Sequence, residues 1–124
     1  MSNEKPVVEA PTGEPSPELV IEDLIVGDGP EAKAGDKVSA HYVGISHSTG
    51  KEFDASWNRG QPLDLQLGAG MVIEGWDKGL QGMKVGGRRR LSIPPHMGYG
   101  PRGVPGVIAP NETLIFVCDL VSAG

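Results

Sequence analysis

The apolar residues of this chain occur in short blocks, and almost every block ends at glycine or proline. Glycine (19 residues) and proline (11 residues) together make up about a quarter of the 124 residues. Short apolar blocks bounded by these residues are typical of β-strands joined by tight turns. A hydrophobic content of 38% is sufficient for a modest core. The pattern therefore predicts one folded, strand-rich domain.

The clearest strand is predicted where Leu63, Leu65 and Leu67 alternate with Asp64 and Gln66. This period of two places one face of an extended chain in a core and the other in water. Other blocks rich in β-forming residues follow the same rule. We expect strands over residues 18–26, 37–45, 52–56, 63–67, 88–94 and 113–121.

Helical spacing occurs in one stretch, where Val72, Trp76 and Leu80 lie four residues apart and Ile73 and Met83 extend the same stripe. Three glycines in this stretch each cost about 1 kcal/mol relative to alanine. Packing of the Trp76 face against a sheet must therefore hold this helix in place. Several strands with one short helix predict an α+β fold, an antiparallel sheet folded over the helix.

Residues 1–17 differ from the rest of the chain, because they contain four prolines, three glutamates and few apolar side chains. We interpret residues 1–17 as a disordered Pro/Glu-rich tail and residues 18–124 as the folded domain. Residues 95–111 form a long loop with many glycines and prolines. Long ordered loops often carry functional residues.

Composition argues against several classes of function. A net charge of −5 disfavours binding to nucleic acid or anionic lipid. The longest apolar run, Leu114–Cys118, is far shorter than the roughly 20 residues of a membrane helix, and no secretion signal is evident. Cys118, the single cysteine, is consistent with a cytoplasmic location. The run 88–90 (Arg-Arg-Arg) is expected to be a solvated strand.

The three histidines have no ligand-like spacing, so neither a metal nor a cofactor is expected. The remaining candidate functional residues are aromatic, and one of them lies in each of five segments. Ordinary core filling explains this distribution, and Asp54 with Arg59 would then be a surface ion pair. The five aromatic residues are Tyr42, Phe53, Trp76, Tyr99 and Phe116.

Five sequence blocks favour a second interpretation, in which the aromatic residues line a cavity. The blocks are His-Tyr-Val-Gly at 41–44, Phe-Asp-Ala-Ser at 53–56, Val-Ile-Glu-Gly-Trp at 72–76, Gly-Tyr-Gly at 98–100 and Thr-Leu-Ile-Phe at 113–116. In order and spacing they closely resemble the FKBP-type peptidyl-prolyl cis-trans isomerases. The resemblance runs from about Glu18 to the C-terminus and implies an antiparallel half-barrel of five to six strands wrapped around one short helix.

The resemblance also implies a pocket between helix and sheet, with Trp76 beneath the substrate proline. The residues it assigns to catalysis are Tyr99, Asp54, Trp76, Phe53 and Phe116. Those it assigns to substrate binding are Tyr42, Arg59, Leu63, Val72, Ile73, Val104 and Ile108. Within this set, the Tyr99 hydroxyl and the Ile73 backbone N–H are expected to donate to carbonyls of the bound molecule, while Tyr42 and Arg59 hold Asp54.

Some positions depart from the family pattern. Leu63 and Met97 stand where many relatives carry aromatic residues, and Val104 replaces a frequent histidine. Trp57, just outside the implied pocket, is a candidate contact for longer peptides. Isomerisation of Xaa-Pro bonds is the expected activity, and a non-catalytic module or folding adaptor that binds proline-containing loops is the alternative.

The expected partners are proline-containing peptides and unfolded proteins, with tacrolimus or rapamycin as further ligands suggested by the resemblance. No nucleic acid or membrane partner is expected. The chain is expected to be a cytoplasmic monomer.

Overall fold

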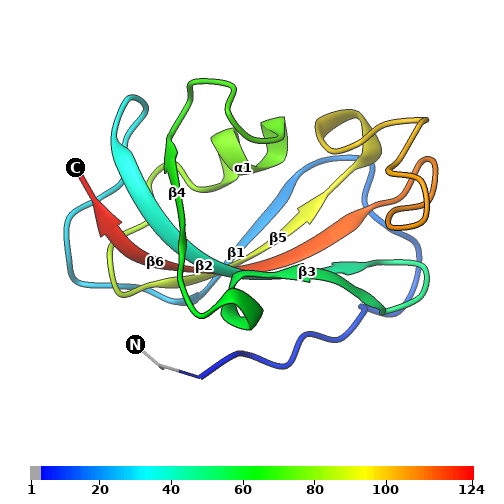
Figure 1. Cartoon of the computed structure of the whole chain (residues 1–124), viewed down its shortest axis with the longest axis horizontal. Coiled ribbons are helices and arrows are strands. Elements are labelled where there is room, and N and C mark those ends of the chain that lie inside the picture. Colours follow the sequence, from blue (N-terminus) through cyan, green and yellow to red (C-terminus); the bar gives the residue numbers. More distant parts are fainter. Residues whose placement is uncertain (1–3) are drawn as a thin grey trace.

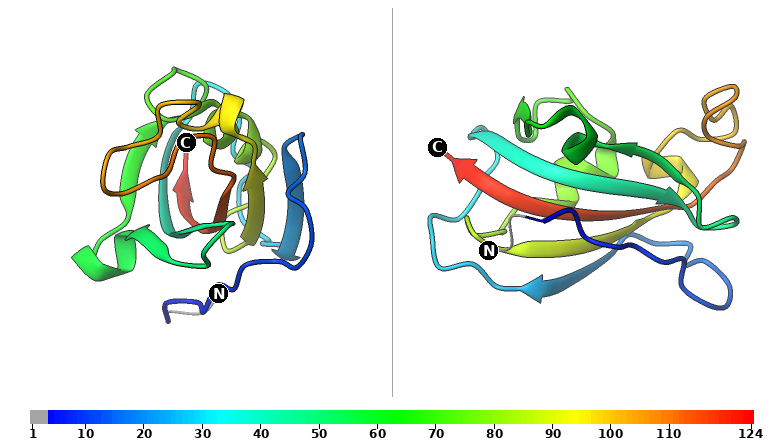
Figure 2. Two further views of the ribbon diagram at one scale, coloured as in Figure 1. Left: turned by 90° about the vertical axis from the view of Figure 1, so that its right-hand side faces the viewer. Right: turned by 60° about the horizontal axis from the view of Figure 1, so that its bottom comes forward.

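The structure, a computed structural model, describes residues 4–124, and a six-stranded antiparallel sheet dominates this range (Figure 1). Its strands are β1 (Val20–Ile25), β2 (Lys37–Ser46), β3 (Glu52–Ala55), β4 (Leu63–Gln66), β5 (Arg88–Ile93) and β6 (Leu114–Ala123). The order across the sheet is β1-β5-β6-β2-β3, and β4 pairs with the first part of β2. The sheet curves around one short helix, α1, so the predicted α+β architecture is confirmed (Figure 2).

Helix α1 (Glu74–Gly79) is shorter than the predicted apolar stripe and lies against β5. A Cβ on Gly75 would lie 2.5 Å from Ile93 Cγ2, and one on Gly79 would lie 2.8 Å from Leu91 Cδ1. Both distances are too short for a real side chain, so the glycines allow the helix to approach the strand. Two 3-10 turns, η1 (Ser56–Arg59) and η2 (Pro95–Met97), complete the helical elements of residues 4–124. None of the helices described is long and apolar enough to cross a membrane.

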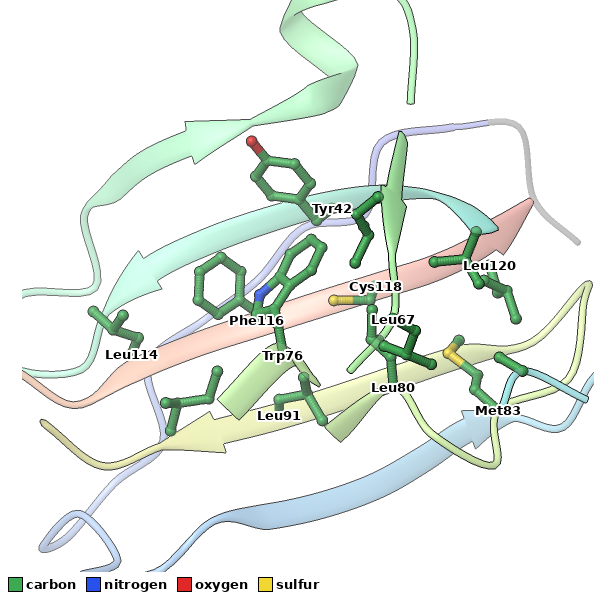
Figure 3. Packing of buried hydrophobic residues seen from close by; sticks show 14 of the residues in the cluster. Tyr42, Leu67, Trp76, Leu80, Met83, Leu91, Leu114, Phe116, Cys118 and Leu120 are labelled. Atoms are coloured by element: carbon green, nitrogen blue, oxygen red, sulfur yellow. The ribbon is translucent and has the colours of Figure 1, made fainter. Parts of the chain in front are cut away.

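The main core lies between the concave face of the sheet and α1 (Figure 3). Leu65 and Leu67 are buried there, as their alternation predicts, and Leu63 is half-buried. Trp76 on α1 packs toward Phe116 on β6, and Leu80, just after the helix, is fully buried. The core therefore fixes α1 over the central strands.

Arg89 contradicts the expectation of a solvated arginine run. Its side chain is 9% exposed, and its Nε donates to Asp23 Oδ1 at 2.7 Å. Its Nη1 donates to the backbone carbonyls of Gly79 at 2.9 Å and Gln81 at 3.0 Å. Alternation along β5 puts Arg89 on the same face as Leu91, where the carbonyls at the end of α1 need donors. The guanidinium thus ties the C-terminus of the helix to β1 and β5.

The N-terminal segment crosses the side of the sheet away from α1 (Figure 1). Residues 4–19 contain no helix or strand, and 1–3 of the predicted tail lie outside the described residues. Val8 and Ala10 nevertheless pack against a second apolar cluster on this outer face. That cluster consists of Val43, Ile45, Ala55 and Ile115, with Trp57 beside it.

Candidate functional site

A cavity of about 410 Å³ opens between α1 and the concave face of the sheet. Aromatic and aliphatic side chains form most of its wall, and the polar groups in it are one carboxylate and two tyrosine hydroxyls. The lining residues are Tyr42, Phe53, Asp54, Leu63, Met71, Val72, Ile73, Trp76, Tyr99 and Phe116. Strands β2, β3, β4 and β6 supply part of the wall. Helix α1, the segment before it and the loop after η2 supply the rest.

The aromatic rings around Trp76 are packed edge to face. The Trp76 ring centroid lies 5.0 Å from that of Tyr42 and 5.4 Å from that of Phe116, at interplanar angles of 85° and 87°. Phe53 meets Phe116 in the same way at 5.5 Å. Such pairs contribute about 0.5–1.5 kcal/mol each beyond the burial of their area. Trp76 is only 3% exposed, so its indole is held rigidly at the base of the cavity (Figure 3).

Three polar side chains form a closed network at one side of the cavity. The Tyr42 hydroxyl donates to Asp54 Oδ2 at 2.5 Å and accepts from Arg59 Nη2 at 2.7 Å. Arg59 Nη1 donates to Asp54 Oδ1 at 2.9 Å. The network holds the Asp54 carboxylate by two donors at the cavity wall.

The protonation states of this network follow from its contacts. Burial, followed by the hydrogen bond to Asp54, raises the pKa of Tyr42, so its hydroxyl keeps its proton at neutral pH. Hydrogen bonds to Tyr42 and Asp54 raise the pKa of Arg59. The Arg59–Asp54 pair is about half exposed, so its own contribution to stability is at most about 1 kcal/mol. Its effect is on geometry, because Arg59 and Tyr42 each hold one oxygen of the Asp54 carboxylate and so fix its orientation.

Two donors remain available near the cavity. Within residues 4–124 the Ile73 backbone N–H has no acceptor, although the Ile73 carbonyl accepts from Trp76 and Asp77 at the start of α1. Tyr99 lines the cavity and is 42% exposed, in the loop after η2. A polypeptide in the cavity would therefore meet a backbone donor on one side and a phenol on the other.

The loop that leads to Ile73 is held by Asp77 of α1. The two carboxylate oxygens of Asp77 accept from the backbone N–H groups of Gly68 and Gly70, each at 2.9 Å. Both glycines have positive φ, 78° and 74°, which other residues rarely adopt. Asp77 is not among the residues predicted from sequence, and only its position four residues after Ile73 could have drawn attention to it. Asp77 thereby fixes the course of the chain into the cavity wall.

Nine of the twelve predicted site residues line the cavity, and Arg59, Val104 and Ile108 do not. Arg59 reaches it through Asp54 and Tyr42. Val104 and Ile108 are paired with each other by two backbone hydrogen bonds of 2.8 Å. Ile108 is 5% exposed in the main core and Val104 packs against that core, so their substrate-binding role stays a prediction.

Three further residues lie in places that the sequence did not indicate. Met71 lines the cavity and is 62% exposed, yet only its position before Val72 pointed to it. Met97 is buried in the main core and is absent from the lining. Trp57 stacks on His41 with ring centroids 4.1 Å apart and packs on the outer cluster, so its role as a contact for longer peptides stays a prediction.

A second hollow, of about 600 Å³, lies near the C-terminus and is lined by residues of β2, β4 and β6. It has no aromatic side chain, and its walls include Lys37 and Asp64. Among residues 4–124, no group of three or more His, Cys, Asp and Glu side chains is placed to hold a metal ion. Of these two hollows, the one above Trp76 combines aromatic walls with polar groups and is the candidate site.

Comparison with known proteins identifies similar chains. Residues 29–121 match the family model of FKBP-type peptidyl-prolyl cis-trans isomerases. An FK506-binding protein from Streptomyces anulatus is 67% identical over 123 residues, which cover 98% of this chain and 99% of that protein. A probable FK506-binding protein from Corynebacterium glutamicum is 51% identical over 120 residues, 97% of this chain and 99% of that one.

Solved structures agree with these sequence matches. The crystal structure of AtFKBP13 superposes with a TM-score of 0.79 at 41% identity, and covers 86% of this chain and 93% of that one. The crystal structure of FkpA from Escherichia coli gives a TM-score of 0.76 at 43% identity, over 85% of this chain and 47% of that one. In both cases the similarity covers more than four fifths of this chain.

Proposed function

This chain belongs to the FKBP-type peptidyl-prolyl cis-trans isomerase family, and we propose that it catalyses rotation about Xaa-Pro bonds in peptides and folding proteins. The observation that supports this most directly is the cavity of about 410 Å³ above Trp76, which has room for a pyrrolidine ring. Its aromatic walls are apolar, and its polar groups stand at the rim and one side.

Rotation about an Xaa-Pro bond requires no nucleophile, because only the double-bond character of the amide is suspended. The uncatalysed barrier of about 18–20 kcal/mol gives relaxation over tens to hundreds of seconds. Turnover at about 10²–10³ s⁻¹ requires the barrier to fall by about 4–7 kcal/mol. That difference must arise from tighter binding of the twisted amide than of either planar form.

The cavity offers two contributions of this kind. A planar amide carries extra negative charge on its oxygen, and walls formed by Phe53, Trp76 and Phe116 solvate that charge poorly. The twisted form has less charge separation, so it loses less hydration free energy when it enters the cavity. The Ile73 N–H and the Tyr99 hydroxyl bind flanking carbonyls and hold the chain while one side of the bond rotates.

The network around Asp54 adds an electrostatic contribution. Two donors hold its carboxylate at the wall that the amide faces. As the amide twists, its nitrogen becomes pyramidal and the nitrogen lone pair localises. The charge of a nearby carboxylate changes the energy of this twisted amide relative to the planar forms. In this proposal Asp54, Tyr99, Trp76, Phe53 and Phe116 are the residues that act on the reacting bond.

The proposal is tested with a chromogenic peptide that contains one Leu-Pro bond, followed from cis to trans at 10 °C. We expect saturable acceleration, and a loss of about 2- to 10-fold in kcat/KM for Tyr99→Phe and Asp54→Ala, the effect of one hydrogen bond or charge. Asp28→Ala, an exposed carboxylate in the turn after β1, is the matched control and should behave as wild type. Absence of acceleration by the folded wild-type protein would refute the proposal.

A non-catalytic binding module is the second candidate, and the aliphatic rim favours it. Leu63 and Met71 both line the cavity, and Met71 is 62% exposed, so the rim can grip apolar residues that flank a proline. This function predicts saturable binding of proline peptides, seen by tryptophan fluorescence, with no turnover. We propose tacrolimus (FK506) and rapamycin as ligands of the same cavity, and each should compete with peptide.

Location and assembly are separate proposals. We propose that the protein acts in the cytoplasm as a monomer, on proline-containing segments of unfolded proteins. Cell fractionation tests the location, and sedimentation equilibrium tests the mass of the assembly. A dimer in the micromolar range would contradict the second proposal.

A further inference from the structure

The N-terminal segment makes specific contacts with the elements that carry one wall of the cavity. Lys5 Nζ lies 2.8 Å from Glu52 Oε1 and donates to Asn58 Oδ1 at 3.0 Å. Asn58 Nδ2 in turn donates to Glu52 Oε2 at 3.2 Å. The three side chains close a ring of contacts that links the N-terminal segment to β3 and η1.

Residues 6–10 alternate as an extended chain on the outer face of the sheet. Pro6, Val8 and Ala10 are half-buried, whereas Val7 is 90% exposed. Val8 and Ala10 pack against the outer apolar cluster of Val43, Ile45, Ala55 and Ile115. The Glu9 backbone carbonyl accepts from Arg90 Nη2 at 3.0 Å, a contact to β5. We call residues 5–10 the strap.

The backbone of β3 is paired on one side only. It lies at the edge of the sheet and pairs with β2 at three positions, with a register irregularity beside Glu52. Phe53 and Asp54 follow Glu52 directly, and Arg59 follows Asn58. The two residues that Lys5 contacts therefore enclose the stretch of chain that supplies Phe53, Asp54 and, one residue later, Arg59.

We propose that the strap positions β3 and η1, and that Lys5 is a positioning residue for the Asp54 wall of the cavity. This inference rests on the proposed function. The apolar contacts of Val8 and Ala10 dock the strap on the sheet, and Lys5 then fixes the spacing between Glu52 and Asn58. Release of the strap lets the edge strand shift, so that Asp54 and Arg59 lose their alignment with Tyr42 while α1 and the core stay in place.

Two neighbouring valines give a matched test in the full-length chain. Val8→Asp places a charge in the apolar contact and detaches the strap, whereas Val7→Asp adds the same charge at an exposed position. Lys5→Met removes the ion pair with Glu52, whereas Lys5→Arg keeps a cation at this position. Lys33→Met is a control that removes the charge of an exposed lysine elsewhere. All variants are compared at 10 °C, with circular dichroism to establish that each is folded.

We expect Val8→Asp and Lys5→Met to lower kcat/KM by about two- to fivefold, the range set by one exposed ion pair or a small apolar contact. Val7→Asp, Lys5→Arg and Lys33→Met should match wild type. Amide cross-peaks of Phe53, Asp54 and Arg59 in ¹H–¹⁵N spectra should shift in Val8→Asp and stay in Val7→Asp.

Three outcomes would overturn the inference. One is equal kcat/KM and equal spectra for Val8→Asp and Val7→Asp. Another is a lower melting temperature for Val8→Asp with unchanged kcat/KM and unchanged Asp54 cross-peaks, which would make the strap a cover and not a positioning element. The third is failure of Lys5→Arg to restore the rate. The wild-type rate in the same assay tests the proposed function separately, and the spectra report on the strap even if no turnover is found.

Discussion

Replacing Gly75 with alanine sets two effects on the free energy of unfolding against each other. Alanine is favoured over glycine by up to about 1 kcal/mol inside a helix. The new Cβ, however, would lie 2.5 Å from Ile93 Cγ2 and 2.7 Å from Ile93 Cδ1, and Ile93 is fully buried. Overpacking of this kind costs about 1–3 kcal/mol, and a contact this short lies at the upper end. We expect a net loss of about 1–2 kcal/mol.

A double-mutant cycle with Ile93→Ala tests the origin of that loss. Ile93→Ala alone should cost about 2–5 kcal/mol because it leaves a cavity. In that background the Cβ of Gly75→Ala has space, so the substitution should become neutral or gain up to about 1 kcal/mol. The expected coupling between the two sites is therefore about 1–3 kcal/mol.

Urea unfolding at 10 °C, followed by circular dichroism, measures each corner of the cycle. Ile93→Val provides a milder background, in which the destabilisation caused by Gly75→Ala should decrease by a smaller amount. If Gly75→Ala has the same effect with Ile93 and with alanine at 93, to within about 0.5 kcal/mol, the close approach of α1 to β5 is refuted. A stabilised Gly75→Ala single variant would refute it as well.

Other parts of the structure yield further tests. Asp77→Asn leaves one acceptor for the two backbone N–H groups of Gly68 and Gly70, so KM should rise about two- to tenfold while the melting temperature changes little; an unchanged KM would remove Asp77 from the positioning of the cavity wall. Arg89→Met should lower the free energy of unfolding by about 1–3 kcal/mol, because two carbonyls at the end of α1 lose their donor; a neutral result in urea unfolding would contradict this. The raised pKa of Tyr42 keeps its proton in the folded state, so the stability it contributes is fully present below its unfolded pKa of about 10 and is lost as pH rises above it. We expect kcat/KM to be flat between about pH 6 and 9 and to fall above about pH 10, and a titration in Tyr42→Phe that still shows the same fall would point to another group.

The sequence predicted the strands well because their burial follows a period of two. Leu65 and Leu67 are buried as the alternation requires, and every predicted strand is present within a few residues of its expected ends. The helix was predicted from a stripe of apolar residues that is longer than α1 itself. Val72 and Ile73 precede the helix and line the cavity, so the stripe contained wall residues as well as helix residues.

Contacts between residues far apart in the chain could not be predicted from the sequence. Arg89 is buried by an aspartate 66 residues away and by the carbonyls that end α1, and no local pattern records either contact. Gly75 counted only as a cost in helix propensity, although its contact with Ile93 explains its presence. The contacts of Lys5 with Glu52 and Asn58 were hidden for the same reason, since the prolines and charges around Lys5 resemble a solvated segment.

The candidate site was predicted largely through resemblance, and the geometry gives it a physical basis. Alternation alone left the aromatic residues as ordinary core filling. The structure instead leaves space above Trp76 and surrounds it with rings held edge to face. Trp57 lies on the opposite face, because the turn η1 directs its ring toward His41.

The most direct test of the account is a titration of isomerisation by tacrolimus at fixed protein and peptide concentrations. If the hollow above Trp76 is where the Xaa-Pro bond rotates, the acceleration should fall linearly and vanish at one equivalent of ligand. Acceleration that persists when tryptophan fluorescence shows the ligand to be fully bound would place the activity elsewhere and contradict the account.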